Sequence, residues 1–187
     1  YIMKSKKRKV KLVSVVFSFR NEEKNISELV KRTSIALKNF SYELIFVNDN
    51  SSDKSLDLLK KLMSTQPIKI INMSRRFGVT PCVIAGLQYA KGDAIVYLDS
   101  DLQDPPELIP ILIDKCQEGA EVVHTKRTSR KGEGLFKIYL TKLAYKIINF
   151  FSDIELEENA GDFKLLSKKA VKNILQLPEY TTYIRGL

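Results

Sequence analysis

Short apolar segments and amphipathic helical segments alternate along most of this chain, and the alternation restricts the fold more than any other feature. The predicted strands are 12–19, 43–47, 68–73, 94–98 and 121–125, and the predicted helices between them are 25–40, 53–63, 80–91 and 106–118. Strands that alternate with helices are typical of parallel sheets. The sequence therefore predicts an α/β domain, with a Rossmann-like, mostly parallel twisted sheet of at least five strands and helices on both faces.

Capping residues predict where two of these helices begin and end. Thr80 is a suitable N-cap with Pro81 at the first helical position, and Gly92 suits the position just after the last turn. Pro106 opens a second helix in the same way, and Gly119 closes it. We expect both helices to connect neighbouring strands of the sheet.

The 187 residues are enough for one domain with a substantial core. We expect a basic N-terminal tail at 1–11, followed by a single catalytic domain at 12–187. The tail is similar to a nuclear localisation patch, but a solvated tail attracted to anionic lipid headgroups is the preferred interpretation. A last helix is predicted at 168–177, just before a proline.

Polar residues follow the ends of four predicted strands, where ligands bind in sheets of this kind. The most informative are Asp99 and Asp101, which come directly after a buried strand and lie on the same side of an extended chain. Two carboxylates with no basic residue between them repel each other unless a cation separates them. Oxygen ligands of this kind suit Mg²⁺ or Mn²⁺. The alternative is a solvated acidic turn.

Other kinds of chemistry lack the necessary residues. The chain has one histidine, His124, and two cysteines, too few for the usual zinc site, and the cysteine usage is typical of a reducing compartment. His124 falls inside a predicted strand, which favours a packing role. No glycine-rich phosphate loop follows any strand. A metal ion and basic side chains are therefore expected to neutralise phosphate.

The charge balance predicts an anionic partner. Lys and Arg number 31 against 22 acids, a formal charge of +9, which suits nucleic acid, an anionic membrane or a phosphorylated substrate. A basic nucleic-acid-binding module is disfavoured, because the aromatic residues lie in apolar stripes rather than among the basic residues. The sequence contains no run of 18 apolar residues, so it predicts no membrane-spanning helix.

Two adjoining segments in the second half suit a phosphate and a lipid. Residues 126–134 form a basic, glycine-containing loop that fits an anion clamp or, alternatively, an exposed surface loop. Residues 135–152 form a helix that is apolar over more than one stripe, with lysines interleaved. Such a helix suits a membrane interface, and a core or dimer helix is the alternative.

Several motifs in this order resemble glycosyltransferase family 2, and in particular its polyprenyl-phosphate branch. The resemblance covers about 13–187 and is carried by Val15–Glu23, Val47–Asp53, Leu98–Glu107, Arg127–Glu133 and Ala160–Leu166. The Leu98–Glu107 segment matches the family pattern Asp-x-Asp-Leu-Gln-Asp-Pro-Pro-Glu without a gap. Departures from the usual residues occur at Ser18, Arg20, Asn48, Asn50 and Lys164.

The resemblance implies a GT-A fold and a nucleotide-sugar donor, with a UDP-sugar favoured and GDP-mannose as the alternative. Asp49 would accept a hydrogen bond from the base, a contact that does not by itself distinguish uracil from guanine. Asp101 would bind the Mg²⁺ or Mn²⁺, and Asp99 would contact the ribose or the ion's waters. The remaining candidates for the donor site are Asn21, Glu22 and Arg76.

The resemblance also implies an inverting transfer to a polyprenyl phosphate. Arg127, Arg130 and Lys164 would hold the acceptor phosphate, and Asp162 would position it or act as a base for a hydroxyl acceptor. A family member that extends a surface polysaccharide is the alternative. We expect action at the cytoplasmic face of a membrane, and the family's membrane helices lie beyond a segment like 183–187. The predicted apolar helix 135–152 is also compatible with a homo-oligomer.

Overall fold

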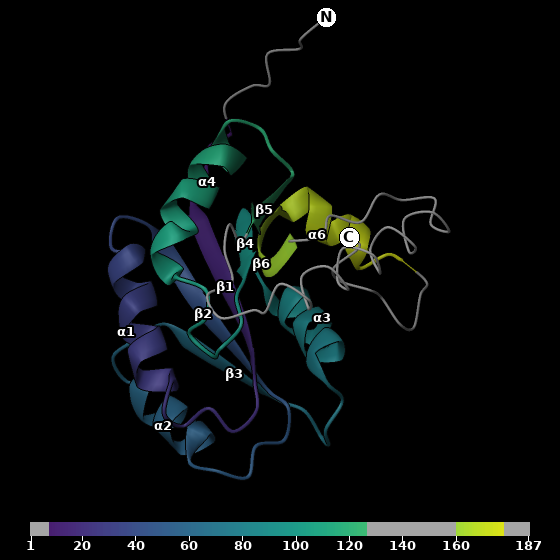
Figure 1. The fold of residues 1–187 in the computed structure, drawn as a ribbon. Coiled ribbons are helices and arrows are strands. Elements are labelled where there is room, and N and C mark those ends of the chain that lie inside the picture. Colours follow the sequence, from purple (N-terminus) through teal and green to yellow (C-terminus); the bar gives the residue numbers. More distant parts are fainter. Residues whose placement is uncertain (1–7, 127–159, 178–187) are drawn as a thin grey trace, which may run out of the picture.

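The computed structural model in Figure 1 describes residues 8–126 and 160–177. Its elements in chain order are β1 (Leu12–Phe19), α1 (Ile26–Ala36), β2 (Ser41–Asn48), α2 (Ser55–Leu62), β3 (Ile68–Asn72), α3 (Val79–Tyr89), β4 (Ala94–Tyr97), the 3₁₀ helix η1 (Pro106–Leu108), α4 (Ile109–Gln117), β5 (Val122–Lys126), β6 (Ala160–Ser167) and α6 (Lys168–Ile174). The strands of the described residues form one six-stranded sheet in the order β3-β2-β1-β4-β6-β5. The predicted mostly parallel α/β sheet is confirmed.

The sheet contains one strand that the apolar pattern did not predict. Residues 160–166 were expected only as a motif, but β6 inserts between β4 and β5 and runs antiparallel to both. Tyr97 at the end of β4 is paired with Lys164 in the middle of β6. Because β6 runs against its neighbours, its N-terminal end lies at the same edge as the carboxyl end of β4. This position brings Asp162 to that edge.

Helices cover both faces of the sheet, as predicted (Figure 1). Helices α1, α2 and α4 bury residues such as Leu29, Leu59 and Ile113 against one face. Helices α3 and α6 pack on the other face through residues such as Val83 and Val171. Burial of these apolar faces supplies most of the stability of helices this short.

Helix α3 approaches the sheet closely because it carries a glycine. A Cβ atom on Gly86 would lie 2.3 Å from Val16 Cγ1 and 3.2 Å from Val47 Cγ2, so no larger side chain fits without movement. The ends of this helix differ from the prediction. It begins at Val79 with Gly78 as N-cap, and Ala90 ends it in an extended conformation.

Gly92, predicted as the end of α3, has a different role. Its N–H donates to Ser14 Oγ at 2.8 Å, and a Cβ atom there would lie 2.6 Å from the Ser14 nitrogen. The close approach therefore explains the glycine. Gly119 does close α4, as predicted, with a φ of 110°. Helix α6 is shorter than expected and begins after Ser167, whose hydroxyl accepts from the Ala170 N–H.

A buried carboxylate stabilises the sheet edge opposite the pocket described below. Glu43 accepts hydrogen bonds from Ser14 Oγ at 2.6 Å, Lys69 Nζ at 2.5 Å and the Lys91 N–H at 2.8 Å. Burial alone would raise the pKa of Glu43, but these three donors together lower it below its ordinary value. The ionised form is therefore the one that the fold stabilises.

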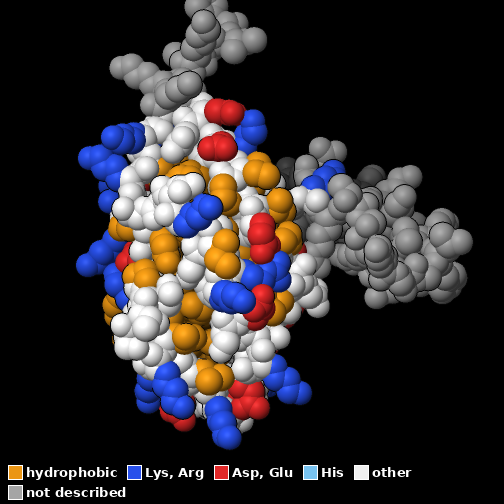
Figure 2. Space-filling view, turned by 90° about the vertical axis from the view of Figure 1, so that its left-hand side faces the viewer, with side chains coloured by type: hydrophobic (Ala, Val, Ile, Leu, Met, Phe, Trp, Pro, Cys, Tyr) orange, Lys and Arg blue, Asp and Glu red, His pale blue; other side chains and the backbone are white. Residues whose placement is uncertain are grey.

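The residues just before β1 are held against the domain. Arg8 donates two hydrogen bonds to the Glu121 carboxylate, at 3.2 and 2.6 Å, and Val10 is buried. His124 lies on β5 as predicted, but its side chain is exposed rather than packed. In the part of the chain that the structure describes, no helix has the length and apolar character needed to cross a membrane. Figure 2 shows basic, acidic and apolar side chains interspersed over one face.

Candidate active site

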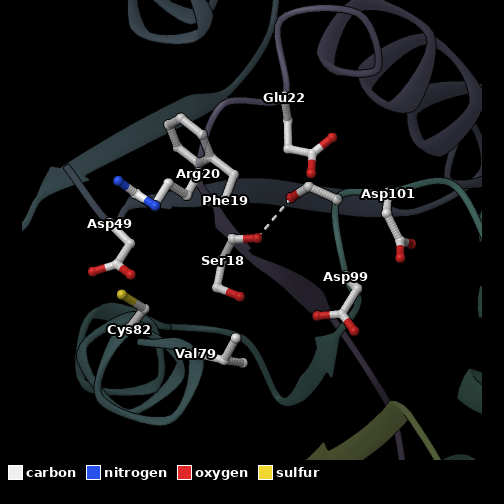
Figure 3. A pocket seen from close by; sticks show the side chains of 10 residues that line it. Ser18, Phe19, Arg20, Glu22, Asp49, Val79, Cys82, Asp99 and Asp101 are labelled. Atoms are coloured by element: carbon white, nitrogen blue, oxygen red, sulfur yellow. Dashed lines mark hydrogen bonds between the residues drawn. The ribbon is translucent and has the colours of Figure 1, made fainter. Parts of the chain in front are cut away.

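A pocket of about 260 Å³ opens at the carboxyl ends of the central strands (Figure 3). Its lining comes from the ends of β1, β2 and β4 and from the start of α3. The lining residues are Ser18, Phe19, Arg20, Glu22, Asp49, Val79, Cys82, Asp99, Ser100 and Asp101. Residues far apart in sequence therefore meet here, as illustrated by Ser100 Oγ, which donates to the carbonyl of Ser18, 82 positions earlier.

The paired acids after β4 line this pocket with different exposures. Asp99 is half-buried, and the Tyr97 hydroxyl donates to its Oδ1 at 2.5 Å. The same hydroxyl lies 3.3 Å from Ser18 Oγ. Asp101 is exposed, and its Oδ1 accepts from the Gln103 N–H at 3.0 Å in the turn where Leu102 has a φ of 60°. Asp99 is thus held in place, whereas Asp101 faces solvent.

Electrostatics at Asp99 favour a cation. Burial raises the pKa of Asp99, and repulsion from Asp162, Asp101 and Asp104 raises it further, against the opposing effect of the Tyr97 hydrogen bond. Residues 8–126 and 160–177 contain no ready-made group of three or more metal-ligating side chains. Two carboxylates with open positions fit a hard divalent ion that takes its other ligands from water and phosphate.

Asp49, directly after β2, lies at the other end of the pocket and is buried. Its Oδ1 accepts from the Phe77 N–H at 2.6 Å, and its Oδ2 accepts from the Gly78 N–H at 3.0 Å. The Cys82 thiol faces this carboxylate in Figure 3. Burial, and secondarily the charge of Asp49, raises the pKa of Cys82 to about 12. The thiol is therefore protonated at neutral pH, which makes it a poor nucleophile.

The predicted residues after β1 divide into one that lines the pocket and one that supports it. Glu22 lines the pocket, and its N–H donates to Ser55 Oγ at 2.9 Å. Asn21 lies outside the lining and has a φ of 58°. Its Oδ1 accepts from the Ser52 N–H at 2.8 Å, so its side chain joins the loop after β1 to the loop after β2.

The cation that lines the pocket differs from the one predicted. Arg76 is exposed on the loop between β3 and α3 and does not belong to the lining, whereas Arg20 does. Arg75 places its guanidinium carbon 4.2 Å from the centre of the Phe77 ring. Arg20 follows β1 directly, and that position was the signal available in the sequence.

The predicted acceptor residues are described in part. Asp162 contributes to the raised pKa of Asp99, so the two acids are close enough to interact. Lys164 is buried on β6 opposite Tyr97. Arg127, Arg130 and the predicted helix 135–152 lie outside the described residues.

The comparisons with known proteins agree with this architecture. Residues 14–175 match the family described as glycosyl transferase family 2. The chain belongs to this family. An uncharacterised glycosyltransferase of Synechocystis is 43% identical over 178 residues, which cover 94% of this chain and 56% of that protein. A prophage bactoprenol glucosyl transferase homolog of Escherichia coli is 40% identical over 182 residues, which cover 96% of this chain and 58% of that protein.

Solved structures confirm the GT-A type of fold. Glucosyl-3-phosphoglycerate synthase of Mycobacterium tuberculosis, crystallised with Mn²⁺, UDP and glucosyl-3-phosphoglycerate, aligns with a TM-score of 0.59 at 20% identity. The alignment covers 85% of this chain and 57% of that protein. The present chain spans little more than half the length of the curated relatives named above.

Two residues that were not predicted as site residues contact the carboxylates of the pocket: Tyr97 donates to Asp99, and the Cys82 thiol faces Asp49. Tyr97 appeared only as part of an apolar strand, and Cys82 only as one of two cysteines without a motif. Only the folded structure brings Tyr97 on β4 next to Asp99 and Cys82 on α3 next to Asp49. No local pattern predicted either contact.

Proposed function

We propose that this glycosyltransferase transfers a sugar, with inversion, from a nucleoside diphosphate sugar to a polyprenyl phosphate. The observation that carries the proposal is the convergence of Asp49, Asp99 and Asp101 on one pocket at the carboxyl ends of the strands. Asp49, the proposed acceptor for a base N–H, lies at one end of the pocket, and Asp99 and Asp101, the proposed metal ligands, lie at the other. Such a division suits a nucleoside diphosphate.

The proposed donor is a UDP-sugar. Each oxygen of Asp49 already accepts one backbone N–H, so about two of its roughly four acceptor positions remain. A uracil ring needs only one of them for its single N–H. A guanine edge, with two parallel donors, would use both, so this contact does not by itself choose between the two bases. The M. tuberculosis neighbour, which was crystallised with UDP, supports the choice of uracil.

Asp101, together with Asp99, is proposed to hold Mg²⁺ or Mn²⁺. A bound divalent ion would stabilise the negative charge that develops on the departing diphosphate. The acidic surroundings that raise the pKa of Asp99 support this assignment, as does the Mn²⁺ in the crystals of the M. tuberculosis neighbour. Arg20 lines the pocket and is a further cation for the diphosphate, in addition to the predicted Arg76.

The proposed acceptor is a lipid phosphate bound beside Asp162 and Lys164. A phosphate monoester has its second pKa near 6, so it is largely dianionic at neutral pH and needs little help from a base. Asp162 would then orient the acceptor rather than deprotonate it. Arg127 and Arg130 would grip its phosphate. The E. coli relative, named for bactoprenol, a polyprenyl carrier lipid, supports this acceptor class.

Because the proposed acceptor is a membrane lipid, we propose that the reaction takes place at a membrane surface, on its cytoplasmic face. The predicted helix 135–152 would contact anionic lipid there, with Lys137, Lys142 and Lys146 near the headgroups. A homo-oligomer remains an alternative role for the apolar surface of that helix. Nucleic acid is not a proposed partner.

The test is turnover of a panel of UDP- and GDP-sugars with undecaprenyl or dolichyl phosphate, in the presence of Mg²⁺ or Mn²⁺. We expect transfer from a UDP-sugar to the lipid phosphate, and no transfer by Asp101→Asn, which should fold normally because Asp101 is exposed. Undiminished UDP affinity in the presence of EDTA would contradict the metal assignment. A water-soluble glycan that outperforms every lipid phosphate would instead support polysaccharide extension, with Asp162 as an essential base.

A further inference from the structure

The loop between β3 and α3, Ser74–Gly78, is held in place by a side chain from a different strand. Asp49 follows β2, and its two oxygens accept the N–H groups of Phe77 and Gly78, consecutive residues of this loop. Asp49 is only 6% exposed, so water competes little for these hydrogen bonds. The carboxylate thus fixes the backbone of the loop just before α3 begins.

The rest of the loop has the features of a segment that needs such an anchor. Gly78 adopts a φ of 91°, a conformation that favours glycine, and Phe77 is exposed. Neither residue belongs to a strand or helix that would pair its N–H. The loop also carries two consecutive exposed cations, Arg75 and Arg76. Arg75 stacks on the Phe77 ring, and Arg76 immediately precedes the anchored Phe77 N–H.

We propose that Asp49 is a positioning residue for this loop, and that it couples recognition of the nucleoside to the placement of Arg76 against the diphosphate. The inference rests on the proposed function, because it assigns to one carboxylate both the base contact and the loop. An ionised carboxylate has enough acceptor positions to keep both amides while it accepts one base N–H. The Asp49 carboxylate can therefore bind the base and hold the loop at the same time.

The first part of the test measures the anchor without any ligand. Hydrogen exchange of the Phe77 and Gly78 amides is followed in wild type and in Asp49→Asn, which replaces one acceptor oxygen with an NH₂ group. We expect at least one of these amides to exchange roughly tenfold faster or more, since a lost hydrogen bond to a charged group has about that effect. Exchange at the wild-type rate would overturn the proposal.

A matched control is available in a neighbouring loop. Asp53 also accepts two backbone amides, those of Glu23 and Ser55, but neither belongs to the loop at 74–78. Asp53→Asn should leave exchange at Phe77 and Gly78 unchanged. Faster exchange in this variant as well would indicate general loosening of the domain and would remove the support for a specific anchor.

The second part measures binding of UMP and UDP by calorimetry with Mn²⁺ present. If Asp49 only contacted the base, Asp49→Asn would weaken both nucleotides by the same factor. We expect UDP to lose several-fold more than UMP, and we expect this extra loss to vanish when Arg76→Ala is already present. Equal losses would overturn the coupling. Failure of wild type to bind either nucleotide would refute the proposed function. The hydrogen-exchange measurement would still test separately whether Asp49 holds the loop.

Discussion

Replacing Tyr97 with Phe removes one buried hydroxyl and leaves the rest of the side chain in place. That hydroxyl donates to Asp99 Oδ1 at 2.5 Å, and Tyr97 is only 2% exposed. A hydrogen bond to a charged group contributes about 1.5–3 kcal/mol. For a domain of this size, each kcal/mol corresponds to roughly 2–4 °C in Tm. Thermal unfolding at pH 7 should therefore show Tyr97→Phe melting roughly 3–12 °C below wild type.

Tyr42→Phe provides the control, because the Tyr42 hydroxyl donates to the neutral Gln66 Oε1 at 3.2 Å. A neutral hydrogen bond contributes only about 0.5–1.5 kcal/mol, so this variant should lose less stability. Tyr97→Phe should also weaken metal-dependent UDP binding, because Asp99 loses the donor that holds it in the pocket. Equal melting temperatures for the two variants would refute the argument that the charge of Asp99 makes this contact important.

Three further changes give separate tests. The pKa of Glu43 is lowered in the folded protein, so its contribution to the free energy of unfolding is present above its ordinary pKa of 4.5 and is lost as the pH falls below that value. The stability of Glu43→Gln, measured by urea unfolding, should therefore fall less steeply with acid than that of wild type. Gly86→Ala should destabilise by ~1–3 kcal/mol through overpacking against Val16, and prior Val16→Ala should relieve much of this loss in a double-mutant cycle. Arg127→Ala or Arg130→Ala should lower kcat/KM for the lipid acceptor roughly ten- to hundredfold, with UDP affinity as an unchanged control; wild-type transfer rates would contradict the acceptor clamp.

Most of the sheet could be predicted because its strands are short apolar runs between clear helices. β1 and β4 have such continuous apolar segments, and both were expected at nearly their observed bounds. β6 was not predicted as a strand. Its buried residues divide between the two faces of the sheet, with Phe163 and Leu165 in one core cluster and Leu166 in the other. Unlike β1 and β4, β6 lacks a continuous apolar run, because Asp162 and Lys164 interrupt it, and its apolar residues are too few to identify a strand by alternation.

Helix ends were predicted less well than helix positions. Thr80 and Pro81 have the composition of a helix start, yet α3 begins at Val79. Asp49 holds the backbone of Gly78 and so determines where the preceding loop ends. A tertiary hydrogen bond therefore took precedence over the local capping preference.

In the candidate site, too, some residues could be predicted from the sequence and others could not. Glu22, Asp49, Asp99 and Asp101 were predicted because each follows a strand that leads to the same edge of the sheet, and all four line the pocket. Arg20 lines the pocket although it was not among the predicted site residues, whereas the predicted Arg76 lies outside the lining. The direction of a long side chain depends on its neighbours in space, which a motif does not specify.

The sequence by itself determined the type of sheet, the edge at which ligands would bind and the carboxylates that gather there, because the succession of strands and helices along the chain follows from local apolar patterns. Only the tertiary structure decided that β6 brings Asp162 toward Asp99, that Tyr97 holds Asp99, and that Asp49 anchors the loop at Phe77 and Gly78. These contacts join residues from separate elements. Their geometry arises when the sheet brings those elements together, so no single segment of the chain encodes it.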